Sequence, residues 1–270
     1  MYGKLYLVPS PLGNLDDISI RQKNVLNMVD FVACEDTRNT TKLLNILGIK
    51  KACISCHEHN ETTSSSLIIK EIKNGKNVAY LSDAGYPCIS DPGFLLTKKC
   101  IENNITIVPL SGASAFLNGL VGSGIDASHF LFYGFLESKQ SVRIQELNKL
   151  KKLPYTILFY EAPHRLIETV NDIYSVFGDR KMCICRELTK IHEEFIRTTT
   201  KEFKDKPLEL KGEMVIVVDK FEEKEKEIDS KTIIEKVNQL VESGLTKKDA
   251  ITSVSILLNI PKNIIKKLFF

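Results

Sequence analysis

The sequence predicts an α/β protein with two α/β domains, an N-terminal one on a mostly parallel sheet and a second on a mixed sheet, followed by a small C-terminal helical extension. Three observations predict this class. In residues 1–124, short apolar runs alternate with helical patterns of about ten to fifteen residues, which is typical of βαβ units. From residue 130 onward there is less helix between the later strands, which favours a mixed sheet. After residue 221, a charged stretch is followed by helical patterns alone.

Each element of the first domain (1–124) follows from its apolar spacing and its flanking turn residues. Apolar runs predict strands at 4–8, 30–34, 52–56, 77–81 and 105–110. Helical spacing of apolar residues predicts helices at 18–29, 40–47, 64–72 and 94–101. Gly48 and Gly75 follow two of these helices, as expected of residues that end helices.

The second domain (125–220) and the extension (221–270) are assigned in the same way. Strands are expected at 130–136, 155–160, 182–185, 195–199 and 214–218, and helices at 142–150 and 164–177. We expect the hinge between the two domains at 121–127. A charged linker at 222–230 precedes helices at 233–241 and 248–258 and a short one opened by Pro261. This last part resembles a helix-turn-helix, and the alternative is a solvated helical appendage packed on the main body.

Composition narrows the class of protein. The 270 residues are 43% hydrophobic and 26% charged, which is enough apolar surface for a buried core and excludes collagen-like and disordered chains. A formal net charge of +3 excludes a protein that holds nucleic acid by bulk charge. It leaves room for a local basic patch.

The cysteines and the N-terminus predict the compartment. No run reaches the ~18 apolar residues of a membrane span, and the N-terminus lacks the basic and apolar regions of a signal peptide. The seven cysteines are odd in number and lie mostly in apolar runs, which is typical of reduced core thiols. We therefore expect a cytoplasmic protein with no membrane association.

A CxxC pair, Cys53 and Cys56, is followed by His57 and His59. This arrangement allows a zinc or redox site. There is no second CxxC at structural-zinc spacing, and the alternation of Ala52, Ile54 and Cys56 favours a strand. We therefore expect no metal site.

Three turns that follow strands are unusual, and ligands of α/β sheets bind beyond the carboxyl ends of the strands. The first turn, VPSPLGNLDD (8–17), has two prolines and Gly13; it is either a ligand-binding turn or only a rigid one. The second, LSDAGYPCISDPG (81–93), holds Asp83 and Asp91, whose carboxylates could bind a metal or ribose hydroxyls. Turn chemistry is the alternative there, and the loop's length favours function. The third, PLSGASAF (109–116), has small residues that admit either a ligand or close helix packing.

Two nucleotide-binding motifs are excluded. GSGIDA (122–127) fits the GxGxxA dinucleotide pattern, but it follows a helical run instead of a strand, so the required context is missing. We interpret it as part of the hinge. No GxxxxGK[ST] occurs, which excludes a P-loop NTPase.

Seven motifs in order carry a resemblance to a known family. They are PSPLGNLDD (9–17), CEDTR (34–38), HEHNE (57–61), SDAGYPCISDPG (82–93), FYEAPHR (159–165), RELTKIHEE (186–194) and GEMVIVV (212–218). Together they resemble the ribosomal RNA small subunit methyltransferase I family, a branch of the tetrapyrrole (corrin/porphyrin) methylase superfamily. The resemblance covers about residues 1–220, and it implies a homodimer that binds S-adenosyl-L-methionine in a cleft between the two domains. The implied reaction is 2′-O-methylation of a cytidine in the decoding region of 16S rRNA in the small ribosomal subunit.

The resemblance also implies the residues that bind the cofactor. They are Pro11, Gly13, Asp83, Gly85, Tyr86, Pro87, Ser114, Ala115, Phe135, Leu136, Glu161, Ala162, Gly212 and Glu213. Tyr86 departs from the acidic residue that the tetrapyrrole enzymes have at this position, whereas Ser82 to Gly85 fit the rRNA branch.

Methyl transfer to a hydroxyl needs alignment of the reacting atoms and a group that accepts the hydroxyl proton. Asp36, His57, Glu58 and Glu61 are candidate bases. Helix capping or an ion pair is the alternative for each of them. We consider His57 and Glu61 the best candidates, since the run HEHNE is dense in polar groups and follows a strand. Their alanine variants should keep cofactor binding and lose methyl transfer.

RNA binding requires positive charge. Arg38 and Arg165 are candidates for orienting an RNA phosphate, and Lys42, Arg143 and Lys190 are further RNA-binding candidates. Two other functions stay open at this point. One is methylation of a tetrapyrrole or another small acceptor on the same fold, and the other is a non-catalytic RNA-binding or ribosome-assembly factor.

Overall fold

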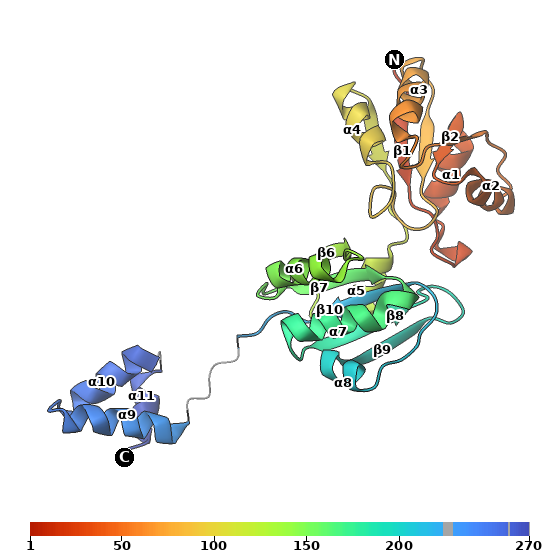
Figure 1. Cartoon of the computed structure of the whole chain (residues 1–270). Coiled ribbons are helices and arrows are strands. Elements are labelled where there is room, and N and C mark those ends of the chain that lie inside the picture. Colours follow the sequence, from red (N-terminus) through yellow and green to blue (C-terminus); the bar gives the residue numbers. More distant parts are fainter. Residues whose placement is uncertain (224–228, 259, 270) are drawn as a thin grey trace. The chain divides into compact units, whose positions relative to one another are not determined.

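The computed structural model describes residues 1–223, 229–258 and 260–269. They form two compact units, Met1–Phe221 and Glu222–Phe270, which are described separately below. The first unit contains two five-stranded sheets, and the second contains helices (Figure 1).

The first sheet is parallel throughout, which confirms the expectation. Its strands are β1 (Lys4–Val8), β2 (Phe31–Cys34), β3 (Cys53–Ser55), β4 (Val78–Leu81) and β5 (Thr106–Pro109). They lie in the order β3-β2-β4-β1-β5, and all four neighbouring pairs are parallel. β2 and β4 are buried along their whole length, as expected for central strands covered on both faces.

Helices cover both faces of this sheet. Apolar residues of α1 (Ile20–Met28) and α2 (Thr37–Ile46) pack with Val8, Val32 and Leu81 on one face. Apolar residues of α3 (Glu61–Lys73) and α4 (Phe94–Glu102) pack with Leu5 and Tyr80 on the other. A short 3-10 helix, η1 (Leu15–Asp17), follows the turn after β1.

The second sheet is mixed, also as expected. It comprises β6 (Phe130–Phe135), β7 (Thr156–Glu161), β8 (Lys181–Arg186), β9 (Glu194–Thr199) and β10 (Met214–Val218), in the order β6-β7-β10-β8-β9. Only β6 and β7 are parallel; the other three neighbouring pairs are antiparallel. A 3-10 turn, η2 (Pro163–Arg165), links β7 to the helix that follows.

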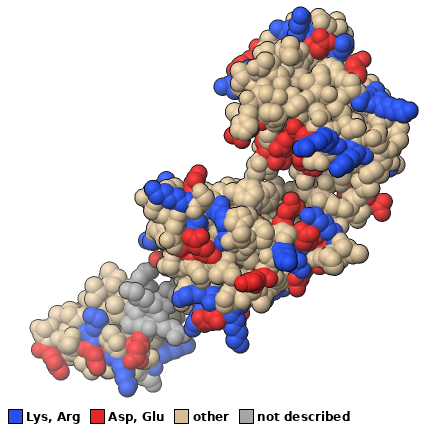
Figure 2. All heavy atoms as spheres, turned by 45° about the vertical axis from the view of Figure 1, so that its right-hand side comes forward, with Lys and Arg blue, Asp and Glu red and all other residues tan. Residues whose placement is uncertain are grey.

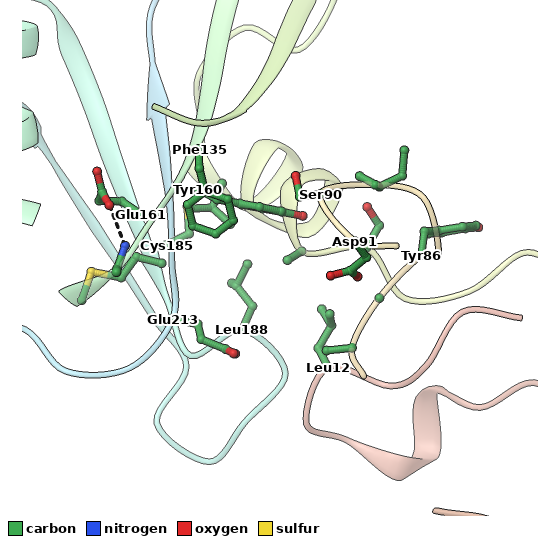
Figure 3. A pocket seen from close by; sticks show the side chains of 18 of the residues that line it. Leu12, Tyr86, Ser90, Asp91, Phe135, Tyr160, Glu161, Cys185, Leu188 and Glu213 are labelled. Carbon is green, nitrogen blue, oxygen red and sulfur yellow. Dashed lines mark hydrogen bonds between the residues drawn. The ribbon is translucent and has the colours of Figure 1, made fainter. Parts of the chain in front are cut away.

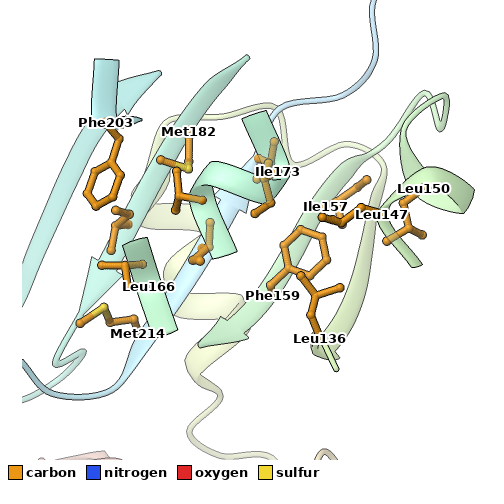
Figure 4. Close-up of a cluster of buried hydrophobic side chains, with 14 residues drawn as sticks. Leu136, Leu147, Leu150, Ile157, Phe159, Leu166, Ile173, Met182, Phe203 and Met214 are labelled. Atoms are coloured by element: carbon orange, nitrogen blue, oxygen red, sulfur yellow. The ribbon is translucent and has the colours of Figure 1, made fainter. Parts of the chain in front are cut away.

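Alternate residues of each strand serve opposite faces of this sheet, as the pleat requires. Met214, Ile216 and Val218 of β10 pack beneath α6 (Gln140–Leu150), α7 (Leu166–Phe177) and α8 (Thr200–Asp205), where Figure 4 shows the buried cluster. Val215 and Val217 pack on the other face, beneath α5 (Ala115–Ser123).

The packing of α5 places the change from one sheet to the other earlier in the chain than we expected. Leu120 of α5 lies in the same buried cluster as Leu158 and Val215 of the second sheet. The connection between the sheets is therefore the segment between β5 and α5, ahead of the expected hinge at 121–127. Within 122–127, Gly122 and Ser123 end α5, and Gly124 follows with a φ of 78°.

In its described residues, the second unit is a small three-helix module. α9 (Ser230–Glu242), α10 (Lys247–Leu258) and α11 (Lys262–Lys267) enclose a core of Ile233, Val237, Ala250, Ile251, Val254 and Ile265. The side chain of Asp229 accepts a hydrogen bond from the Lys231 amide at the start of α9, so the helix begins inside the expected linker 222–230. Most of the remaining linker lies outside the described residues. No helix in the described part of the chain is long and apolar enough to cross a membrane.

A buried arginine joins two helices of the second sheet's layer. Arg143 of α6 is 0% exposed, and its guanidinium contacts Asp172 at 2.7 Å and Glu168 at 2.6 Å on α7. Its Nη1 also donates to the Ser138 carbonyl at 2.9 Å. This corrects the expectation that Arg143 binds RNA, because the guanidinium is enclosed and has its partners inside the protein.

Removal of the Arg143 side chain should therefore destabilise the fold. We expect Arg143→Ala to lower the free energy of unfolding by about 3–5 kcal/mol, because it leaves Asp172 as a buried charge without its partner. Urea unfolding followed by far-UV circular dichroism measures this change. Lys149→Ala is the matched control, since Lys149 is an exposed cation on the same helix and should change the free energy by less than about 0.5 kcal/mol. Equal effects in the two variants would contradict the structural role.

Candidate active site

The topological switch point of the first sheet lies between β1 and β4. These strands are parallel neighbours, yet the chain leaves β1 toward α1 on one face and leaves β4 toward α4 on the other. Their carboxyl ends therefore open a crevice, which is where open α/β sheets bind ligands. Both loops are among the three unusual turns of the sequence.

Backbone hydrogen bonds fix these two loops to each other. The Ser10 amide donates to the Gly85 carbonyl at 2.8 Å, and the Gly85 amide donates to the Ser10 carbonyl at 2.9 Å. Ser82 Oγ adds a bond to the Gly85 carbonyl at 3.0 Å. Gly85 has a φ of 72°, a conformation that favours glycine. The Tyr86 hydroxyl accepts from the Gly112 amide at 2.9 Å, which fixes the third predicted turn to the second.

A cavity of about 300 Å³ opens at this crevice and extends to the second sheet (Figure 3). One wall comes from the loops after β1, β4 and β5, and the other comes from β7, β10 and the loop after β8. The residues that line it are Leu12, Ala84, Gly85, Tyr86, Ile89, Ser90, Asp91, Ser114, Ala115, Phe135, Tyr160, Glu161, Ala162, Pro163, Cys185, Leu188, Glu213, Met214 and Val215.

The cavity combines an apolar wall with carboxylates. The rings of Phe135 and Tyr160 lie edge to face with centroids 5.5 Å apart. Burial raises the pKa of the Tyr160 hydroxyl to about 12. Glu161 is held in place, because Oε1 accepts from the Ala162 amide at 2.8 Å and Oε2 accepts from the Thr169 hydroxyl (the first bond is dashed in Figure 3). Arg165 lies 3.4 Å from the same carboxylate.

Two of the lining loops hold strained backbone. Cys88 and Ser90 in the loop after β4, and Glu187 and Thr189 in the loop after β8, all have positive φ between 50° and 70°. Non-glycine residues rarely adopt this conformation, and it is concentrated at functional sites. The strain coincides with the two loops that face each other across the cavity.

The structure brings eight of the predicted cofactor residues to this cavity. They are Gly85, Tyr86, Ser114, Ala115, Phe135, Glu161, Ala162 and Glu213. Pro11 and Pro87 are not among the lining residues, although both belong to lining loops. Leu136 is buried in the core of the second sheet, and Asp83 is exposed and accepts from the Asn39 amide group at 2.8 Å.

Gly13 and Gly212 lie beside a pair of ion contacts at the cavity edge. Lys190 contacts Glu187 at 3.0 Å and Glu213 at 2.9 Å. A Cβ on Gly13 would lie 2.3 Å from Lys190 Cγ, and one on Gly212 would lie 2.3 Å from Glu187 Oε1. These glycines therefore make room for the ion contacts that hold the Glu213 wall.

Several lining residues did not stand out in the sequence. Tyr160, Cys185 and Val215 lie on the sheet face covered by α5, and Leu12 and Leu188 come from loops far apart in sequence. The alternation of residues along the strands predicts that Cys185 and Val215 share one face of the sheet. It does not predict that this face borders a ligand site, because the opposing wall comes from another sheet.

A second cavity adjoins the first and shares two residues with it. It measures about 510 Å³ and is lined by Glu35, His57, Glu58, His59, Glu61, Ser90, Asp91, Pro92 and Phe94. Ser90 and Asp91 line both cavities. Burial, followed by the negative charges of Glu35 and Asp83, raises the pKa of Asp91 to about 7. The pKa of Glu35 is raised by the same causes, burial first and then Asp83.

The structure gives Glu61 a structural role. The residue is only 8% exposed, and Oε1 accepts hydrogen bonds from the Gly93 amide at 3.1 Å and the Leu96 amide at 2.9 Å. Glu61 therefore caps the start of α4 from the neighbouring helix α3, with Oε1 as the acceptor of both bonds.

Asp36 and Arg38 are paired with each other. The Arg38 guanidinium lies 2.6 Å from Asp36, and Asp36 also accepts from the Arg38 amide at 2.8 Å, where it caps α2. The hydrogen bonds from Arg38 lower the pKa of Asp36 to about 2. A carboxylate with so low a pKa is a weak proton acceptor. Neither residue lines the two cavities described above.

His57 remains at the second cavity, with its Nδ1 buried and without a hydrogen-bond partner among the described residues. Its ring lies edge to face with His59, with centroids 5.9 Å apart.

The cations expected to bind RNA are mostly engaged within the protein. Arg165 donates to the Leu136 and Glu137 carbonyls at 2.8 and 3.1 Å, and Lys190 has the ion contacts described above. Arg38 and Lys42 are exposed on α2, and Arg38 is paired with Asp36. Figure 2 shows Lys and Arg interspersed with Asp and Glu on the face in view. Among the described residues, no cluster of three or more His, Cys, Asp or Glu could hold a metal ion.

Comparisons with known proteins agree with the fold and the order of the motifs. The family model for Tetrapyrrole (Corrin/Porphyrin) Methylases matches residues 4–204. "Ribosomal RNA small subunit methyltransferase I" of Bacillus subtilis (strain 168) is 43% identical over 267 residues, which cover 96% of this chain and 91% of that protein. The protein of the same name from Escherichia coli O157:H7 is 35% identical over 98% of this chain and 94% of its own length.

Solved structures show the same fold at low identity. A cobalt precorrin-4 methyltransferase has a TM-score of 0.60 at 16% identity and covers 80% of this chain and 94% of its own. A uroporphyrin-III C-methyltransferase from Thermus thermophilus, solved with S-adenosyl homocysteine, has a TM-score of 0.59 at 13% identity and covers 80% of this chain and 97% of its own. The chain therefore belongs to the tetrapyrrole methylase family, in its ribosomal RNA small subunit methyltransferase I branch, and is an S-adenosylmethionine-dependent methyltransferase.

Proposed function

We propose that this enzyme transfers the methyl group of S-adenosylmethionine to the ribose 2′-hydroxyl of a cytidine in the decoding region of small-subunit rRNA. The observation that carries the proposal is the cavity at the switch point of the first sheet, in a chain whose relatives bear the name of ribosomal RNA small subunit methyltransferase I at 35–43% identity over nearly its full length. The names of these relatives give small-subunit rRNA as their substrate, and we extend it to this chain.

The lining of the first cavity suits S-adenosylmethionine. The aromatic pair Phe135 and Tyr160 offers ring surface for an adenine, and the carboxylates of Asp91 and Glu213 offer negative charge for the sulfonium and ammonium groups. The bound cofactor supplies a methyl group already activated by the positive sulfur. The protein's contribution is then to hold the hydroxyl in line with it, an effect of up to about 7–11 kcal/mol, and to accept the proton.

We further propose that the enzyme acts on the small ribosomal subunit as a homodimer in the cytoplasm. Exposed apolar side chains of α5, Leu117 and Val121, support self-association, because an uncovered apolar helix face is typical of a protein interface. All seven cysteines are free, which suits a reducing compartment.

Methylation of a small acceptor is the competing function. The solved neighbours named for tetrapyrrole substrates share only the fold with this chain, at 13–16% identity. The tetrapyrrole function therefore has less support than the rRNA function.

Tritiated methyl transfer distinguishes the two. We expect label from S-adenosylmethionine to enter isolated small subunits and to appear as 2′-O-methylcytidine after nuclease digestion, since the proposed acceptor is a ribose oxygen. Naked rRNA and uroporphyrinogen are the comparison substrates. Label on a nucleobase, or labelling of uroporphyrinogen alone, would refute the proposal.

The role of Glu61 is tested by two substitutions. Because Glu61 caps α4 through one oxygen, we expect Glu61→Gln to keep the cap and to retain methyl transfer within about threefold. Glu61→Ala should lose about 0.5–2 kcal/mol of stability together with activity. Thermal unfolding and single-turnover transfer measure both. A loss of roughly 10²–10⁴-fold in Glu61→Gln at unchanged stability would instead identify Glu61 as the base.

A further inference from the structure

We propose that the second cavity receives the acceptor nucleotide, with the Phe94 ring as the stacking surface for its base and Asp91 as the general base that takes the proton of the ribose hydroxyl. The inference rests on the proposed function. It begins from the arrangement of the two cavities, which meet only at Ser90 and Asp91. A group transferred from a ligand in one cavity to a ligand in the other must pass these residues.

Phe94 has the properties of a stacking platform. It is the first residue of α4 and lines the second cavity, yet 68% of its surface is exposed. An aromatic side chain exposed to this extent gains by covering its ring, and stacking a nucleobase contributes about 1–3 kcal/mol.

The backbone beneath Phe94 is firmly held. The preceding Gly93 has a φ of 119°, and a Cβ there would lie 2.5 Å from the Tyr80 ring. Glu61 binds the Gly93 amide, as described above. The ring is therefore presented by a fixed helix start, which limits the conformational entropy lost when a base stacks on it.

Charge in the second cavity indicates which part of a nucleotide enters. Glu35 and Glu58 line it together with Asp91, so a phosphate would be repelled from its interior. A carboxylate accepts a hydrogen bond from the amino group of cytosine, which uracil lacks. The cavity therefore suits an unstacked cytidine whose phosphates stay outside.

Asp91 is the carboxylate best suited to accept the proton. It reaches both cavities, and Figure 3 shows it on the loop side of the first cavity with Ser90. Its pKa of about 7 is near the pH at which a base works best, whereas Asp36 is far below that value and Glu61 caps α4. Apart from the second-cavity lining described above, which includes Glu35, the titratable groups that interact with Asp91 are Asp83, Cys88 and Tyr160.

The step balances as follows. As the ribose oxygen forms its bond to the methyl carbon, the carbon–sulfur bond breaks and its electron pair remains on the sulfur. The hydroxyl proton passes to the Asp91 carboxylate. The products are a ribose methyl ether, a neutral thioether and protonated Asp91, which returns its proton to water.

The stacking role is tested with Phe94→Ala and a matched control on the same helix. Ile101 lies seven residues further along α4, is 64% exposed and does not line either cavity, so Ile101→Ala removes a similar exposed apolar side chain. We expect Phe94→Ala to raise the KM for small subunits about tenfold, Phe94→Trp to restore it, and Ile101→Ala to leave it unchanged. Calorimetric affinity for S-adenosylmethionine should be the same in all three variants.

Equal KM values for Phe94→Ala and Ile101→Ala would overturn the stacking role. If only the stacking role is wrong, wild-type protein still yields 2′-O-methylcytidine. If the proposed function is wrong, wild-type protein does not yield it.

Asp91 is tested through the pH profile. Because the base must be a carboxylate, wild-type kcat/KM for small subunits should rise with pH through about 7 and then level off. Asp91→Asn should lower kcat roughly 10²–10⁴-fold and remove this rise. Asp91→Glu should restore part of both, and thermal unfolding and cofactor affinity, measured alongside, show whether the variant is folded and loaded.

Substitution of a neighbouring residue tests the role of Asp91 without relying on a loss of activity. Asp83 raises the pKa of Asp91 through its negative charge. Asp83→Asn should therefore move the rise in kcat/KM to lower pH while keeping its shape. Carbon-13 NMR of labelled aspartate should show the same displacement in the unliganded protein. A rise that persists in Asp91→Asn, or that does not move in Asp83→Asn, would overturn the assignment of Asp91.

Discussion

The pair of backbone hydrogen bonds between Ser10 and Gly85 is the contact on which the site depends. β1 and β4 are adjacent, but their loops turn toward helices on opposite faces of the sheet, so nothing in the sheet itself keeps the two loops together beyond the strand ends. The two bonds fix them at the point where they diverge. Gly85 can take part because its φ of 72° turns the chain back toward β1.

Some carboxylates at this site stabilise the local backbone, and one, Asp91, is proposed to take part in the reaction. Glu161 accepts from Ala162 and Thr169, and Glu61 accepts from two amides of the α4 start. These bonds hold both side chains in place. Burial and like charges oppose the ionisation of both Asp91 and Glu35. Asp91 differs because it lines both cavities, whereas Glu35 lines only the second. Acidic side chains at this site thus serve either structure or chemistry, depending on their local surroundings.

Much of the fold could be predicted from the sequence, because strand and helix periodicities act locally. These patterns predict the parallel and mixed sheets and the three loops at strand ends. They do not predict the roles of Glu61 and Arg143, because a charged residue in a polar helical stretch gives the same pattern whether it faces solvent or a buried partner. Tyr160 and Leu188 were missed for another reason. They line the cavity only because two sheets meet there, and no local sequence pattern in one sheet predicts that contact.

The charge distribution explains how a nearly neutral chain can act on RNA within the proposed function. Arg143, Arg165 and Lys190 are neutralised by carboxylates or bound to carbonyls of their own chain, so they add little to long-range attraction. The second cavity, lined by carboxylates, repels phosphate as well. An enzyme built in this way gains more from a substrate whose target nucleotide is already displayed than from strong attraction to any RNA. An assembled ribosomal subunit offers such a substrate by its shape, and shape recognition is characteristic of proteins that bind structured RNA.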